Sequence, residues 1–348
     1  MNESFKGLEG YWILFTKDNL RLPADYVLAP FTAVHQTGIW INVWLSRGLG
    51  VPARKHGLYL TNGVEWLEYK FGEHGLPTVA TEYMAVDSHD QLWLSVPYTG
   101  ICCFDGHSTV SYTFGQAGLP EDMVITDLHI DKEDRVWLAT LQHGIYRLTE
   151  QEWKRITSDI RVLSDCVVAF GVDRRNSLWL ACKDRKEIRF LSNRSGSWEL
   201  VCSLHLVNKQ QDEVVCFVVD SDDRIWAGRR CGGLMIWERQ RWQQLTERDC
   251  PLLFGEIQSL AIDAYDNLWV GTAGGFAIFD GNRWHDWGAI RPGSSEKATS
   301  RENLLSADSE TVSRYVYIGG FVAIDGVGRK WLNSAKGLVM FTPRSRHR

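Results

Sequence analysis

Apolar and polar residues alternate in short runs along the chain, and each run ends in a polar turn. The segment 123–157 shows this as MVITDLHID, VWLAT, GIYRLT and WKRIT, separated by the turns KEDR, LQH and EQE. A period of two residues is typical of strands, and residues such as Asp and Gly favour tight reversals of the chain. The pattern predicts four short antiparallel strands in this segment.

The four-strand pattern repeats along the chain. Six copies carry an aspartate six residues before a tryptophan in the second strand, as in VDSHDQLWLS and VDSDDRIWAG. A seventh copy, TAVHQTGIWIN, keeps the tryptophan but lacks the aspartate. Four strands in about 40–45 residues are typical of a β-propeller blade, so we expect an all-β, seven-bladed β-propeller with four antiparallel strands per blade. The blade anchors are Trp40, Trp93, Trp137, Trp179, Trp226, Trp269 and Trp331.

The two ends of the chain complement each other. The last copy stops after its third strand, GLVMFTP, whereas the early residues GLEGYWILFT match the outer strand of other copies. We therefore expect the N-terminal strand to complete the C-terminal blade within a single domain, residues 1–348, which removes a free sheet edge. The polar segment 290–314 interrupts the last interval and is predicted to be an inserted loop, either flexible or folding onto a partner.

Composition narrows the classes of function. Of 16 tryptophans, seven anchor blades and six begin outer strands, so packing explains most of them better than sugar binding does. The net charge of −5 makes nucleic-acid binding unlikely. The sequence has no signal-peptide pattern and no run of about 18 apolar residues, so we expect a cytoplasmic protein with no membrane contact.

Cysteines and acidic turns are candidates for metal chemistry. None of the eight cysteines forms a CxxC pair, so we expect buried free thiols in a reducing cytoplasm, with a disulfide or redox role as the alternative. Turns such as DKEDR supply too few oxygen ligands for calcium, and capping of tight turns suffices to explain their aspartates. We expect no metal and no cofactor.

One copy matches a known repeat best. The run LAIDAYDNLWVGTAGGFAIFDGNRW, residues 260–284, resembles the two-component regulator propeller repeat. Such repeats form ligand-sensing regions of bacterial hybrid sensor kinases, and the resemblance covers nearly the whole chain. It implies a propeller fold and a sensing role. Because those sensors carry a membrane segment and a kinase that this sequence lacks, a signal is expected to leave through a partner protein, as for a stand-alone propeller.

The loops between second and third strands, together with the leaders between blades, are expected to share one binding face. These loops sum to about +7 and the leaders to about −6, which partly cancels the patch. An anionic ligand or an acidic partner is one reading of the loops, and solvated charge is the other. The aromatics Trp44, Tyr98 and Trp237 could project from loops or blade surfaces to anchor a partner or stack on a sugar, with packing as the alternative. The loop histidine His143 could also contact a partner. The basic candidates are Arg54, Lys55, His56, Lys183, Arg185, Lys186, Arg229, Arg230 and Lys336.

No catalytic constellation stands out, so we expect a non-enzymatic recognition or scaffold subunit that binds a protein through one propeller face. The partner could be an effector, a kinase or an assembly subunit. One alternative is a sensor of a small anionic or sugar-like ligand. Another is an enzyme similar to virginiamycin B lyase, which would use His56, His74 or His143 with a metal; this sequence resembles that lyase only in its general strand pattern.

Overall fold

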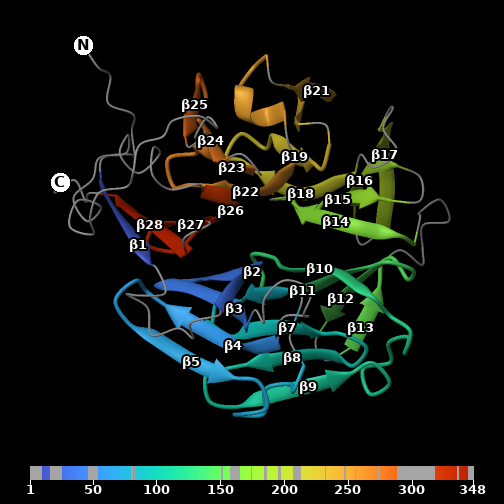
Figure 1. The fold of residues 1–348 in the computed structure, drawn as a ribbon. Coiled ribbons are helices and arrows are strands. Elements are labelled where there is room, and N and C mark those ends of the chain that lie inside the picture. Colours follow the sequence, from blue (N-terminus) through green and yellow to red (C-terminus); the bar gives the residue numbers. More distant parts are fainter. Residues whose placement is uncertain are drawn as a thin grey trace. The chain divides into compact units, whose positions relative to one another are not determined.

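The fold is a seven-bladed β-propeller of four-stranded antiparallel sheets, as predicted (Figure 1). The structure is a computed structural model. It describes residues 10–15, 26–45, 54–79, 81, 83–149, 152–156, 165–173, 175–183, 186–194, 197–206, 213–231, 233–246, 248–254, 256–272, 275–287, 318–334 and 337–343. The insertion at 290–314 lies outside these residues, so its character stays a prediction.

Each blade runs from a first to a fourth strand in sheet order. Blade one holds β2 (Tyr26–His35), β3 (Gly38–Leu45), β4 (Arg54–Thr61) and β5 (Trp66–Lys70). Blade two holds β6 (Met84–Val86), β7 (Leu92–Val96), β8 (Gly100–Phe104) and β9 (Thr109–Thr113). Blade three holds β10 (Ile125–Ile130), β11 (Val136–Thr140), β12 (Ile145–Thr149) and β13 (Glu152–Arg155). Blade four holds β14 (Val167–Val172), β15 (Leu178–Cys182), β16 (Glu187–Arg194) and β17 (Ser197–His205).

The remaining blades follow the same order. Blade five holds β18 (Val214–Val219), β19 (Ile225–Arg229), β20 (Leu234–Glu238) and β21 (Arg241–Leu245). Blade six holds β22 (Ile257–Ile262), β23 (Leu268–Thr272), β24 (Gly275–Phe279) and β25 (Trp284–Trp287), and a short 3-10 helix, η2 (Pro251–Phe254), precedes it. Blade seven holds β26 (Ile318–Ile324), β27 (Lys330–Ser334), β28 (Gly337–Pro343) and β1 (Gly10–Phe15).

The chain divides into two compact units. One is Val27–Val219, and the other joins Met1–Tyr26 to Asp220–Arg348. The first unit contains blades two to four and nearly all of blade one, and the second contains blades six and seven. The boundary falls within blade five, between β18 and β19.

The N-terminal strand completes the C-terminal blade, as expected. Strand β1 pairs antiparallel with β28, from Gly10 opposite Pro343 to Phe15 opposite Leu338. Figure 1 draws β1 in blue beside β28 in red. The pairing gives β28 a partner on its outer side, where it would otherwise expose unpaired backbone N–H and C=O groups.

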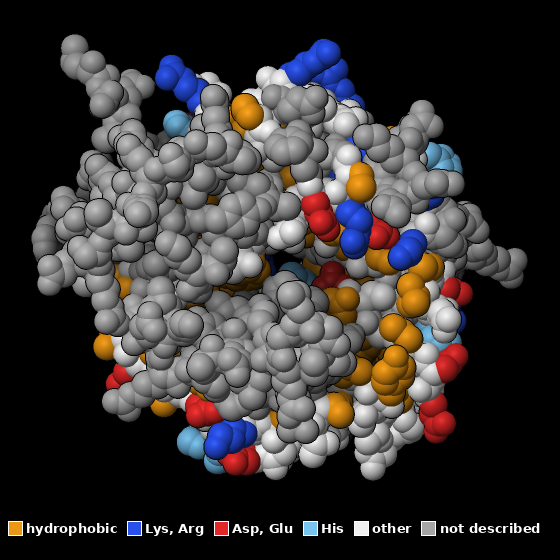
Figure 2. All heavy atoms as spheres, in the orientation of Figure 1, with side chains coloured by type: hydrophobic (Ala, Val, Ile, Leu, Met, Phe, Trp, Pro, Cys, Tyr) orange, Lys and Arg blue, Asp and Glu red, His pale blue; other side chains and the backbone are white. Residues whose placement is uncertain are grey.

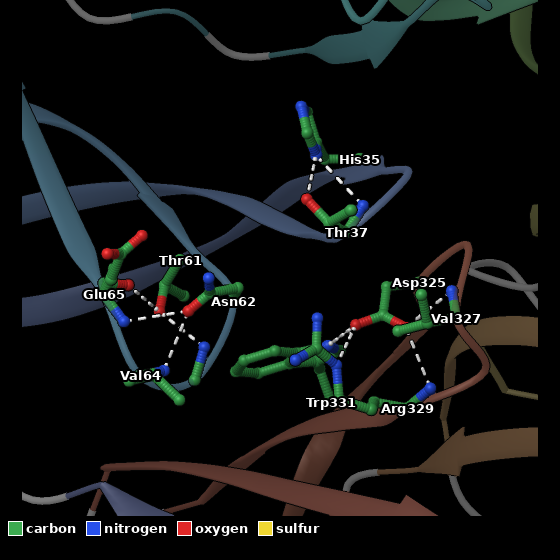
Figure 3. A network of polar contacts seen from close by, with 11 residues as sticks. His35, Thr37, Thr61, Asn62, Val64, Glu65, Asp325, Val327, Arg329 and Trp331 are labelled. Atoms are coloured by element: carbon green, nitrogen blue, oxygen red, sulfur yellow. Dashed lines mark hydrogen bonds and ion pairs between the residues drawn. The ribbon is translucent and has the colours of Figure 1, made fainter.

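The repeated aspartate ties the first turn of a blade to its tryptophan. In blade three, Asp131 Oδ1 accepts the backbone N–H groups of Glu133 and Arg135, at 2.9 and 3.0 Å. Its Oδ2 accepts the indole N–H of Trp137 at 2.7 Å. Figure 3 shows the corresponding network at Asp325. The same indole-to-carboxylate bond joins Trp93 to Asp87, Trp226 to Asp220, and Trp269 to Asp263.

The second acidic position of these turns has left-handed backbone. Asp90, Asp134 and Asp266 have φ of 62°, 57° and 63°, a conformation that Asp and Asn adopt more readily than most residues. All three carboxylates also link neighbouring blades, and Asp90 accepts the backbone N–H of Gln36 in blade one at 3.3 Å. Asp134 accepts the backbone N–H and the hydroxyl of Ser88 at 2.8 and 2.5 Å, and Asp266 binds Ser221 at the same two distances. The D-x-x-D spacing thus serves both the turn and the contact between blades.

In blade one a histidine, His35, caps the first turn in place of the repeated aspartate. His35 Nδ1 accepts the backbone N–H of Thr37 at 3.1 Å across a two-residue turn (Figure 3). His35 Nε2 also lies 3.4 Å from Asp90 Oδ1 in blade two. No aspartate reaches the anchor of this blade, and the buried indole N–H of Trp40 has no hydrogen-bond acceptor among the described residues.

The tryptophans pack between blades, as the sequence predicted. All seven anchors are buried. Trp93 packs with Leu128 and Leu138 of the next blade, and Trp269 packs with Val322 and Leu332 of blade seven. These aromatic contacts, together with the aspartate bonds, hold successive sheets face to face.

A buried ion pair joins blades six and seven. Lys330 Nζ lies 3.5 Å from Asp263 Oδ2, and both side chains are 1% exposed. Lys330 precedes the anchor tryptophan, where blades two and three have Leu92 and Val136. Its ammonium also lies 5.5 Å from the ring centre of Trp269. In blades three, five and seven the repeated aspartate binds an arginine on its own turn, between the first and second strands. In blade six the cation comes instead from the neighbouring blade.

Candidate functional site

The predicted basic face carries acidic partners. Lys183 Nζ lies 3.6 Å from Glu213 Oε2, and Arg230 Nη1 lies 3.7 Å from Glu256 Oε1. Both carboxylates belong to leaders, so the cancellation expected from the sequence takes the form of ion pairs. Arg229 is buried at 6% exposure. Figure 2 shows basic and acidic side chains interspersed over the described surface, with hydrophobic side chains open to solvent between them.

Several predicted residues lie where the structure gives no side-chain detail. Arg54, Lys55 and His56 belong to β4, but their side chains are outside the described part of the structure, as are Arg185 and Lys336. Lys186 is exposed and has a left-handed φ of 50°. An anion-binding role for this set stays a prediction.

Among the aromatic candidates whose side chains are described, Tyr98 is the most exposed to solvent. It lies on the loop between β7 and β8 and is 88% exposed. Its φ of 60° places a bulky residue in left-handed backbone, which costs about 1 kcal/mol or more relative to glycine or asparagine. By contrast, Trp237 packs against Trp242 with ring centres 5.5 Å apart, and the side chain of Trp44 is not described.

Tyr98 borders a cleft between its own loop and the leader into blade three. The loop wall is Ser95–Tyr98, and the opposite wall is Phe114 with Met123–Ile125. Two hydrogen bonds fix these walls, from Phe114 N–H to the Thr99 carbonyl at 2.9 Å and from Leu141 N–H to the Val124 carbonyl at 2.9 Å. The lining is largely apolar, since the wall residues Val96, Phe114, Met123 and Ile125 are hydrophobic and buried.

An ion pair lies next to this cleft. His143 Nε2 is 3.0 Å from Asp122 Oδ1, and Asp122 directly precedes Met123 of the cleft wall. The His143 backbone N–H donates to Thr140 Oγ1 at 3.0 Å, which orders the loop after β11. The side chain of Asp122 is 73% exposed and that of His143 is 22% exposed, so the carboxylate faces solvent at the mouth of the site.

The sequence named Tyr98 and His143 but missed the cleft that they border. Phe114 and Met123 lie on either side of the leader sequence GLP, residues 118–120, and the sequence alone indicates only a connection between blades there. Each is apolar and each looks like ordinary core. One feature of the sequence could have indicated the site. Glu121 and Asp122 directly precede the apolar residue Met123, just before the first strand of blade three.

Two further titratable groups lie on β10. Burial raises the pKa of Asp127 to about 6, although its carboxylate accepts backbone N–H groups from Leu128 and Phe170. Burial also lowers the pKa of His129, whose ring lies edge-on to Phe170 at 5.8 Å. Both groups are therefore biased toward their neutral forms.

The cysteines are free thiols, as the sequence predicted, and no disulfide is formed. Burial raises the pKa of Cys102 and Cys103 to about 12, and nearby carboxylates add to the effect at Cys103. These two thiols are protonated at neutral pH and are poor nucleophiles. Across the described ranges no group of three His, Cys, Asp or Glu side chains is arranged to hold a metal ion.

Comparison with known families then identifies the repeat. Residues 251–274, which run from η2 through β22 into the turn after β23, match the model of the two-component regulator propeller. The chain carries this propeller repeat. The resemblance seen in the sequence is confirmed on the copy that suggested it.

Solved structures share the fold of this propeller at low identity. The extracellular domain of a hybrid two component system from B. thetaiotaomicron is 16% identical with a TM-score of 0.64, over 96% of this chain and 42% of that one. Virginiamycin B lyase from Staphylococcus aureus with quinupristin is 12% identical with a TM-score of 0.63, over 97% and 100%. YCF48 bound to D1 peptide is 11% identical with a TM-score of 0.61, over 99% and 100%. A search of curated proteins gives no significant match.

These comparisons correct the expected location. The similar propellers of one- and two-component systems are extracellular domains, which points to periplasmic or extracellular placement, so the cytoplasmic expectation is wrong. That expectation rested on a missing signal pattern and on free thiols, and buried thiols resist oxidation in either compartment. In the described part of the chain, no helix is long and apolar enough to cross a membrane.

Proposed function

We propose that this regulator propeller is a recognition module that binds a protein partner at the cleft beside Tyr98. The observation that carries the proposal is Tyr98 itself. It exposes a large aromatic ring, which gains nothing for the fold, from a backbone conformation that disfavours tyrosine. Local strain that packing does not require is concentrated at functional sites, and exposed tyrosines beside apolar pockets are common anchors of interfaces.

The size of the cleft favours a protein partner over an enclosed small ligand. The cleft has a volume of about 40 Å³, which is enough for a few water molecules. Sites that enclose a whole small molecule are several times larger. A single side chain projecting from a larger partner fits this space, and the remaining contacts would come from the loops around it.

The comparisons support the same proposal. One propeller of this fold was solved with a bound peptide, and others are extracellular parts of two-component systems. Peptide binding and extracellular placement are both accounted for if the protein is a module outside the cytoplasm that senses a protein and passes the signal to an effector or kinase. His143 contributes through its pair with Asp122, which holds the wall of the cleft in place.

Site-specific photocrosslinking tests the proposal. A benzophenone amino acid placed at Tyr98, in the organism that makes the protein, is expected to form an adduct with a defined protein. The matched control places it at Tyr265, an exposed tyrosine of a first turn in blade six. Identical adducts at both positions, or no protein adduct at position 98, would contradict the proposal.

The matching stability test uses Tyr98→Gly. Glycine adopts the left-handed backbone without strain, so the free energy of unfolding should stay the same or rise by up to about 1 kcal/mol. Urea unfolding followed by tryptophan fluorescence measures it. A clear loss of stability would mean that Tyr98 serves the fold rather than a partner.

A further inference from the structure

The surroundings of the cleft carry charge of one sign. The two segments that contain its walls, 95–99 and 114–125, hold two carboxylates and no Lys or Arg, and the neighbouring loop 140–144 adds one histidine. Glu121 and Asp122 directly precede Met123 of the cleft wall, and both are exposed. This differs from blades four and five, where Lys183 and Arg230 pair with leader carboxylates. A cationic group would complement the mouth of the cleft, and an anionic group would be repelled.

The interior of the cleft suits an alkyl chain. Its lining includes Val96, Phe114, Met123 and Ile125, all buried. A volume of about 40 Å³ admits a slender chain more readily than a ring. Long basic side chains place their methylene groups on apolar surface and keep the charged end in water, where it would meet the carboxylates.

The ring of Tyr98 adds a third element of recognition. A cation over the face of an exposed tyrosine gains about 0.5–1 kcal/mol. We infer that the cleft, within the function proposed above, recognises a Lys or Arg side chain of the partner protein. The alkyl stem lies on Phe114 and Met123, and the cationic end lies between the Tyr98 ring and the carboxylates of Glu121 and Asp122.

Peptide selection tests the inference with defined probes. Random heptapeptides displayed on phage are selected on the full chain, and binders that also bind the Tyr98→Gly variant are discarded. The expected result is a Tyr98-dependent set enriched in Lys or Arg and depleted in Asp and Glu. The strongest peptide is then labelled with fluorescein, and its affinity is measured by fluorescence anisotropy.

The variant series separates charge from shape. Glu121→Gln combined with Asp122→Asn should weaken binding at least fivefold, and raising the salt concentration from 50 to about 300 mM should weaken wild-type binding similarly. A copy of the peptide with norleucine in place of its basic residue should bind wild type and the double variant alike. Asp222→Asn removes an exposed carboxylate from the first turn of blade five, serves as the matched control for a lost surface charge, and should leave the affinity for the basic peptide within about twofold.

The outcomes distinguish the two proposals. Tyr98-dependent peptides without a basic residue, or a double variant that binds the basic peptide as tightly as wild type, would overturn the charge inference and leave recognition at the cleft standing. If no peptide depends on Tyr98 and position 98 gives no protein adduct, both proposals fall.

Discussion

Replacing Lys330 by leucine removes the cation from a pair that is buried between blades six and seven. Leucine suits the site sterically, because other blades have an aliphatic residue before the anchor tryptophan. The electrostatic loss is larger. Asp263 would remain 1% exposed without its countercharge, and Trp269 would lose the ammonium that lies 5.5 Å from its ring.

The structure sets the expected magnitude. Removing one partner of a buried ion pair costs about 3–5 kcal/mol. Asp263 keeps four donors, namely the backbone N–H groups of Tyr265 and Asn267, the Asn267 amide and the Trp269 indole, so the lower part of that range applies. We expect Lys330→Leu to reduce the free energy of unfolding by about 3 kcal/mol.

Urea unfolding of four proteins measures the coupling: wild type, Lys330→Leu, Asp263→Asn and the double variant. In the Asp263→Asn background the leucine substitution should be neutral or stabilising, because no buried charge is left unpaired. A loss below about 0.5 kcal/mol in wild type, or an equal loss in both backgrounds, would refute the reasoning. In either case the pair would contribute nothing beyond its packing.

Two further predictions concern buried titratable groups. Because the pKa of Asp127 is raised in the folded state to about 6, folding takes up a proton and stability is lost as pH rises through about 4 to 6. Asp127→Asn should therefore raise the free energy of unfolding by about 1–2 kcal/mol at pH 7.5, after allowance for one lost acceptor, and have little effect at pH 4. Urea melts at both values check this, and an equal effect at both would contradict it. Cys102 and Cys103 should react with a thiol reagent at pH 8 only after unfolding, because burial keeps them protonated; rapid reaction of either thiol in the native protein would count against this.

Much of the fold was predictable because it is local and repeated. The alternation of apolar and polar residues, the Asp-to-Trp spacing and the turn residues each depend on a few neighbouring positions. Their recurrence in seven copies strengthens the prediction of four-stranded blades. The exception in blade one was visible as a missing aspartate. That His35 would cap a shorter turn was not visible, because the sequence does not show the length of that hairpin.

The individual polar contacts between blades, and the cleft beside Tyr98, were not predictable. The buried pair of Lys330 with Asp263 could not be predicted, because the two residues lie on different blades and their positions in the repeat do not show which side chains meet. Tyr98 was named as an exposed aromatic, but its left-handed backbone and the apolar wall from the next leader appear only in three dimensions. Likewise, the positive sum of the loops could not reveal which leader carboxylate pairs with Lys183.

The pairing of β1 with β28 has a consequence for biosynthesis. Strand β1 leaves the ribosome more than 300 residues before β28, which at about 5–20 residues per second is a delay on the order of 15–60 seconds. Throughout that time the segment GYWILF, apolar and rich in aromatic residues, has no strand to pair with, and such segments are prone to aggregate. Strand β1 is made long before the strand that pairs with it, so the nascent chain depends on protection of this segment until β28 has emerged.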